Sequence, residues 1–369
     1  MAAPVTAVLP HDTGTWLPLH LLLVGALLSA ISGATQLLAV TWSSSPAPAD
    51  GIVAAQRWSV VLGAVAVATG REVDLDAVTG SGALLLGVGL VLLGAILLGI
   101  RRRSSADRFH PAIEAYVAAV GFGVVGIGMG AAIAAGDAGD WWGRVRAAHL
   151  ALNVLGLVGL VVAGTLPYFV ATQVRMKMSP RARPTRVRVG TAVLAGTTVV
   201  AVGGHLLDRP GIAAAGLLGY AAGLVAVATT LPTPGRRQLR WAGPRLVQLG
   251  AGGLWWLAMV VALAVVRLTD ATTEGRVLAA LAVGGFAQIL VASLAYLGPV
   301  LRGGGHQRLT AGFATTASWP GLALANVAAV ALLVDLRAAA AVAAGLWALD
   351  TGWRGVRLLT DDGSVERPR

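Results

Sequence analysis

The sequence predicts an all-α integral membrane protein, built as a polytopic bundle of transmembrane helices. Nine stretches run without Asp, Glu, Lys or Arg for about twenty residues or more, the length that an α-helix needs to cross the hydrocarbon core of a bilayer. Hydrophobic residues make up 56% of the chain and charged residues only 12%, against about 25% charged in soluble domains. Because lipid offers no hydrogen bonds, every backbone polar group must be satisfied within the helices. The nine stretches are 13–49, 77–100, 115–136, 147–174, 189–207, 211–235, 246–266, 277–301 and 309–334.

Two weaker spans complete the prediction. Trp58–Gly70 is apolar but short, and Ala338–Leu349 continues to Trp353 only by including Asp350. With both accepted, residues 1–369 form one integral membrane domain of 11 spans, and a twelfth is left open for the tail after Ala338. The predicted spans are 16–42, 54–70, 79–100, 112–135, 147–171, 189–207, 211–231, 246–266, 277–301, 311–334 and 338–356.

The distribution of Lys and Arg predicts the orientation of these spans. Basic segments alternate along the chain with acidic or neutral ones, so that one side of the membrane receives 21 of the 28 Lys and Arg residues. Positively charged loops stay cytoplasmic, which places the amino terminus outside and the carboxy terminus inside a multi-pass cell-membrane protein. The net charge of +11 then reflects basic loops beside anionic lipid, and no nucleic-acid partner is expected. With no cysteine in the chain, disulfides, iron–sulfur clusters and thiolate metal sites are excluded.

Three histidines lie inside apolar spans at a similar depth. His20 and His149 are near the outer starts of spans 1 and 5, and His205 is at the outer end of span 6. Ionisable residues at membrane depth are costly and mark functional sites, and histidine is a common ligand of metals and haem. These three residues are therefore the predicted metal or haem ligands. The alternative is that each is an interhelical hydrogen-bonding or interfacial residue.

Span 5 carries further candidate residues. Asn153 follows His149 by one helical turn and shares its face with Gly156, so Asn153 is a candidate cofactor contact. Upstream, Arg144 and Arg146 form an aromatic and basic rim with Trp141 and Trp142. Arginine suits planar carboxylates, which makes both arginines candidates for binding haem propionates. Lipid phosphate, Asp137 and Asp140 are the alternative partners of these two arginines.

Parts of the sequence resemble a known family. The run His20-Leu-Leu-Leu-Val-Gly-Ala-Leu-Leu-Ser-Ala-Ile-Ser-Gly33, followed by Trp42, resembles the first helix of NnrS-type membrane proteins, which are haem- and copper-containing relatives of the catalytic subunit of haem-copper oxidases. Stretches 149–169 and 287–306 are similar to the actinobacterial membrane region that is often joined to copper nitrite reductase or multicopper oxidase domains. The similarity covers roughly Trp16 to Val334.

This resemblance implies haem b, copper or both at His20, His149 and His205, in a bacterial plasma membrane. It implies electron transfer from quinol to an outer cupredoxin-type copper enzyme such as nitrite reductase, or a part in nitric oxide metabolism. The paired copper-ligand histidines and the His–Tyr partner of the oxidases have no match here, so a proton-pumping terminal oxidase is not expected. Any enzymatic activity would be of the oxidoreductase type. A copper or small-molecule permease and a cofactor-free scaffold subunit remain as alternatives, and a homo-oligomer is left open.

Overall fold

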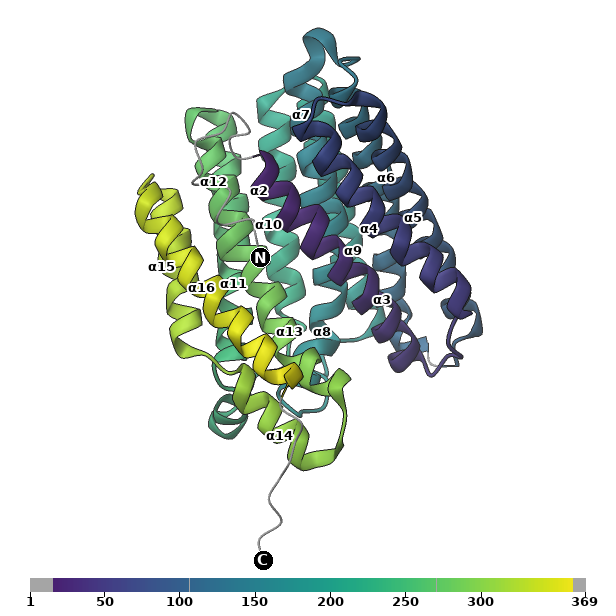
Figure 1. Cartoon of the computed structure of the whole chain (residues 1–369), viewed down its shortest axis with the longest axis vertical. Coiled ribbons are helices and arrows are strands. Elements are labelled where there is room, and N and C mark those ends of the chain that lie inside the picture. The colour runs from purple at the N-terminus through teal and green to yellow at the C-terminus, as the bar shows by residue number, and fades with distance from the viewer. Residues whose placement is uncertain (1–15, 106, 270, 361–369) are drawn as a thin grey trace, which may run out of the picture.

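The computed structural model describes residues 16–105, 107–269 and 271–360, and within them it forms a helical bundle that contains no strand (Figure 1). The predicted fold class is confirmed. Ten helical segments are long and apolar enough to cross a membrane, and α16 (Arg337–Thr360) is an eleventh long helix of 24 residues. We call the two ends of the bundle the Trp16 end, where the first helix starts, and the Thr360 end, where the last one finishes.

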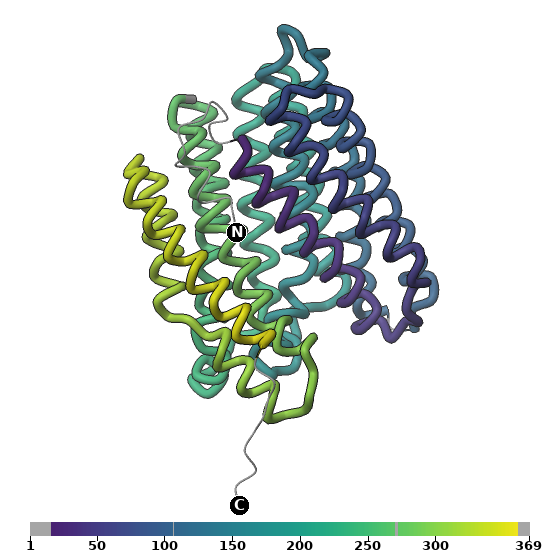
Figure 2. The backbone as a smooth tube through the Cα atoms, viewed as in Figure 1, coloured from purple at the N-terminus to yellow at the C-terminus, as the bar shows by residue number. Residues whose placement is uncertain are grey.

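The first half of the chain supplies five membrane crossings. Span 1 consists of α2 (Trp16–His20), η1 (Leu21–Leu27) and α3 (Leu28–Ser43), and it runs obliquely across one face of the bundle (Figure 2). It is followed by α4 (Asp50–Glu72), α5 (Asp76–Arg103) and, after the short η2 (Asp107–Phe109), α6 (His110–Ala134). Span 5 consists of η3 (Gly139–Trp141), α7 (Trp142–Ala151), η4 (Leu152–Gly159) and α8 (Leu160–Gln173).

The second half begins with α9 (Pro184–Leu206), α10 (Pro210–Ala228) and α11 (Arg236–Leu268). Helix α11 bends at Gly243, whose φ of +59° is in the left-handed region that favours glycine, immediately before Pro244. Span 9 consists of α12 (Glu274–Ala280), preceded by η5 (Ala271–Thr273), then η6 (Leu281–Ala287) and α13 (Gln288–Arg302). The last elements are α14 (Gly305–Thr316), α15 (Trp319–Leu333) and α16.

Two predicted spans need correction. The span predicted at 54–70 is longer, because α4 already begins at Asp50 after the extended Ala49. The span predicted at 311–334 is two helices, α14 and α15, that meet at Ala317 and Ser318. The side chain of Ser318 accepts a hydrogen bond from the backbone N–H of Gly321 at 2.8 Å, which caps α15, and Pro320 follows at its start. The described part of the chain contains no twelfth span.

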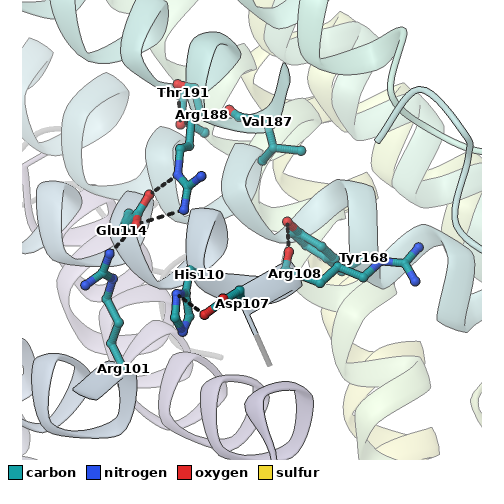
Figure 3. A network of polar contacts seen from close by, with 9 residues as sticks. All are labelled: Arg101, Asp107, Arg108, His110, Glu114, Tyr168, Val187, Arg188 and Thr191. Atoms are coloured by element: carbon teal, nitrogen blue, oxygen red, sulfur yellow. Dashed lines mark hydrogen bonds and ion pairs between the residues drawn. The ribbon is translucent and has the colours of Figure 1, made fainter. Parts of the chain in front are cut away.

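Consecutive spans alternate in direction, so the basic segments gather at the Thr360 end as predicted (Figure 1). There, Glu114 of α6 joins three helices (Figure 3). It accepts hydrogen bonds from Arg101 of α5 at 2.7 Å and from Arg188 of α9 at 2.7 Å. Because Glu114 lies between two guanidinium groups, its negative charge is matched on both sides. Which end faces the cytoplasm remains a prediction.

Buried amides connect the first three spans. Gln56 of α4 is fully buried, and its Oε1 accepts hydrogen bonds from Ser32 at 2.8 Å and from Gln36 at 2.9 Å. Its Nε2 donates to the backbone carbonyl of Gly89 in α5 at 3.2 Å. Such hydrogen bonds between helices are favourable in lipid, because no water is present there to hydrogen-bond an unpaired amide. Gln36, which the sequence places within span 1, is thus a contact between helices.

A structural unit recurs along the chain. Spans 1, 5 and 9 each contain a π-helical segment, starting at Leu21, Leu152 and Leu281. Each segment has a glycine four residues after its start and a small residue eight further on, namely Gly25 and Gly33, Gly156 and Gly164, and Gly285 and Ser293. A closely packed helix pair follows each time: α4 with α5, α9 with α10, and α15 with α16. A π-interrupted helix followed by a helical hairpin thus occurs three times among the described residues, with α6 before the second copy and α11 before the third.

Candidate functional site

The imidazole of His149 is held against helix α6 by a hydrogen bond to the backbone of that helix. Its Nδ1 lies 2.7 Å from the carbonyl oxygen of Gly126. A carbonyl can only accept a hydrogen bond, so Nδ1 carries the hydrogen and Nε2 has a free lone pair. The side chain of Asn153 lies 3.3 Å from the same Nδ1 but donates to the backbone carbonyl of His149 at 2.9 Å. Asn153 therefore packs beside the imidazole and fixes its position.

Glycines in α6 make room for these two side chains. A Cβ atom at Gly130 would lie 2.7 Å from Cε1 of His149, and a Cβ at Gly126 would lie 2.8 Å from Cγ of Asn153. A Cβ at Gly156 would likewise lie 2.6 Å from the Phe122 ring of α6. The predicted shared face of His149, Asn153 and Gly156 is therefore confirmed, and it faces α6.

His20 has a comparable environment. Its Nδ1 lies 2.8 Å from the carbonyl oxygen of Trp16, so it too carries the hydrogen on Nδ1. The Trp16 ring stacks on the imidazole with the centroids 4.2 Å apart. His20 is half-buried, as is His149. Both imidazoles thus have the same tautomer, set by a backbone carbonyl.

His20 and His149 both lie towards the Trp16 end of the bundle, where a weak electrostatic interaction links the two imidazoles. Within the described part of the chain, Nε2 of neither ring takes part in a hydrogen bond. A histidine that ligates a metal generally donates its other ring N–H to a carbonyl or carboxylate, which fixes the orientation of the ring. Nε2 of each ring is therefore available to ligate a haem iron or a copper ion.

His205 does not share this site. It lines a cavity of about 480 Å³ at the Trp16 end, between α7, α9, α11 and α12, and neither His20 nor His149 is among the lining residues. Among the described residues, no group of three or more His, Asp or Glu side chains is placed to share a metal ion. The three predicted ligands thus separate into a pair and a lone histidine.

Arg144 and Arg146 line the same cavity as His205. Arg144 donates to Asp208 at 3.0 Å and lies over the Trp141 ring, 5.1 Å from its centroid. Arg146 lies over the Trp142 ring at 5.8 Å. The ionic partner of Arg144 is therefore Asp208, a residue that the sequence analysis did not consider. Arg146 also lies one helical turn before His149 in α7 and interacts with it electrostatically, so the pairing of these arginines with propionates stays a prediction.

Two features of the site were missed in the sequence. The first is the set of π-helical segments: η1 begins directly after His20, and η4 begins three residues after His149. Such segments are rare and frequent at functional sites. The second is the extension of the arginine-lined cavity to Arg209, Arg267 and Glu274. The glycine that recurs four residues into each π-helical segment was a signal in the sequence for these segments. The extent of the cavity could not be predicted, because it depends on which helices are neighbours.

Comparison of the chain with protein-family models, with curated proteins and with solved structures finds no match. The class that the fold defines is a multi-pass helical membrane protein. The resemblance to NnrS-type proteins stays a prediction.

Proposed function

We propose that this chain is a membrane redox protein in which His20 and His149 together hold a haem b or a copper ion. The observation that carries the proposal is the matching state of two histidines at the same end of the bundle. Each ring donates its Nδ1 hydrogen to a backbone carbonyl, and each has Nε2 without a hydrogen-bond partner among the described residues. Bound there, the group would supply one-electron chemistry.

The residues around the pair have defined tasks in this proposal. Gly126 and Trp16 orient the two imidazoles through their carbonyls. Gly130 provides the space for the His149 ring, and Asn153 packs beside it. Burial together with the axial ligands sets the potential of a haem. Electrons would come from quinol and pass to an outer copper enzyme such as a nitrite reductase, or serve nitric oxide metabolism, in a bacterial plasma membrane.

The test is a reduced-minus-oxidised optical spectrum of the full chain purified in mild detergent, with iron and copper measured on the same sample. A sharp b-type α-band, or copper near one per chain, is the expected result. A colourless protein that contains neither metal, and that takes up neither haem nor copper when these are added, would overturn the proposal and favour a scaffold role.

Gly130→Ala is expected to lower the affinity for the bound group about 10–100-fold, the usual cost of disturbing a contact that orients a ligating histidine. The added methyl group would lie 2.7 Å from the His149 ring, so the ring must turn away. Gly128→Ala is the matched control, because the same methyl on the same helix has no neighbour within 4 Å. Titration of haem or copper into the two purified variants measures the difference, and equal affinities would contradict the assignment.

A further inference from the structure

We propose that the cavity lined by Arg144, Arg146, Arg209 and Arg267 is a binding site for a phosphate-bearing ligand, separate from the histidine pair. The cavity has a volume of about 480 Å³ and lies at the Trp16 end of the bundle. Ligand sites commonly have volumes of about 300–1,000 Å³. We call it the arginine vestibule.

The vestibule has a positive charge that its own carboxylates do not cancel. Besides the four arginines, its lining includes two carboxylates, Asp208 and Glu274. Arg144 pairs with Asp208 at 3.0 Å, and Arg267 pairs with Glu274. Among the described residues, Arg146 and Arg209 have no carboxylate partner. The lining therefore has two more arginines than carboxylates, an excess of positive charge that favours an anionic phosphate group.

The unpaired arginines are suited to a phosphate by their geometry. Arginine presents a planar fork of donors that binds phosphate oxygens in pairs, and such charge-assisted hydrogen bonds are about twice as strong as neutral ones. Arg146 comes from α7, whereas Arg209 precedes α10. The two donors therefore reach the cavity from different helices, which favours a ligand held between them.

One further group supports a ligand deeper in the vestibule. His205 of α9 lines both the vestibule and a smaller cavity of about 30 Å³ that is otherwise mostly apolar. Arg267 and Glu274 line both cavities as well. The smaller cavity has room for about one water-sized group, so the ligand would lie mainly in the vestibule, beside these shared residues. The phosphate belongs either to a lipid headgroup or to a molecule from the aqueous phase.

The experiment uses the full chain in non-ionic detergent. Binding of inorganic phosphate is measured by titration calorimetry. In a second measurement, the protein is incorporated into nanodiscs that contain phosphatidylglycerol and released, and the retained lipid molecules are counted by native mass spectrometry. The variants are Arg146→Gln and Arg209→Gln. Each removes one charged donor and is expected to weaken binding at least about tenfold. Arg71→Gln is the matched control, since this exposed arginine ends α4 at the same end of the bundle but does not line the vestibule.

Asp208→Asn is expected to act in the opposite direction. It frees Arg144 and raises the excess charge, so phosphate or phosphatidylglycerol should bind more tightly. Asparagine tolerates the left-handed backbone at this position, where φ is +54°. Phosphate binding that depends on Arg146 and Arg209 would identify a ligand from solution, and retention of phosphatidylglycerol with the same dependence would identify a lipid. Binding of neither probe, or binding that all the variants leave unchanged, would overturn the proposal.

Discussion

If the proposed function is correct, His149→Ala is expected to yield a folded protein that no longer binds haem or copper. The substitution removes the imidazole whose Nδ1 is fixed by Gly126 and whose Nε2 is free for a ligand. Disturbing the hydrogen-bond partner of a ligating histidine costs about 10–100-fold in affinity, and removal of the ligand itself costs at least as much. The absorbance of the bound group and the metal content, both measured per chain, report the loss.

Two variants make this result specific. His20→Ala is expected to lose the group as well, because the proposed site uses Nε2 of both imidazoles. His205→Ala is the matched control: it removes a half-buried histidine at the same end of the bundle that lies in the arginine vestibule instead. Full cofactor content in both His20→Ala and His149→Ala, with a normal elution profile, would remove the pair from consideration. Loss in His205→Ala alone would move the site to the vestibule.

Gly204→Ala is expected to lower the free energy of unfolding by about 1–3 kcal/mol, the usual cost of overpacking. Gly204 is buried where α9 meets α10, and a Cβ there would collide with the backbone of Ala213. A backbone cannot swing aside as a side chain can, so the two helices must separate. Thermal unfolding in detergent, monitored by circular dichroism, measures the change.

The neighbouring glycine provides the control for this prediction. A Cβ at Gly203 would have no atom within 4 Å, and alanine is favoured over glycine in a helix by about 1 kcal/mol. Gly203→Ala should therefore be neutral or stabilising, so that two adjacent positions respond with opposite signs to the same substitution. If both variants unfold at the wild-type temperature, the close approach of α9 and α10 is not as the structure describes it.

Much of the fold could be read from the sequence because lipid imposes a simple rule of length and polarity. The alternation of basic and acidic segments justified the weak spans, and α4 and α16 are indeed long helices. The break at Ser318 was missed because apolar residues continue on both sides of it. The cap was visible as Ser-Trp-Pro, but hydropathy carries no information about capping.

The candidate site was only partly predictable. Residue type and depth selected His20, His149 and His205, yet which of them are neighbours depends on how the spans pack, and depth along a helix says nothing of that. The face shared by His149, Asn153 and Gly156 was predictable because it is local to one helix. Arg209 and Glu274 were not predicted as site residues, because each lies at a helix end. Only the packing of α9, α10 and α12 around one cavity brings them together.

The π-helical segments have a consequence for how such a chain tolerates changes in length. A π turn is a place where a helix accommodates one residue more than the α-helical repeat allows. Loss of one residue within η4 could be absorbed by closing the segment into an ordinary α-helix, without breaking the span. Every side chain before it would then turn by about 100° relative to those after it, carrying His149 away from Gly126. A deletion here would preserve the membrane crossing while displacing His149, so homologous chains that are one residue shorter at η4 would share the bundle without sharing the site.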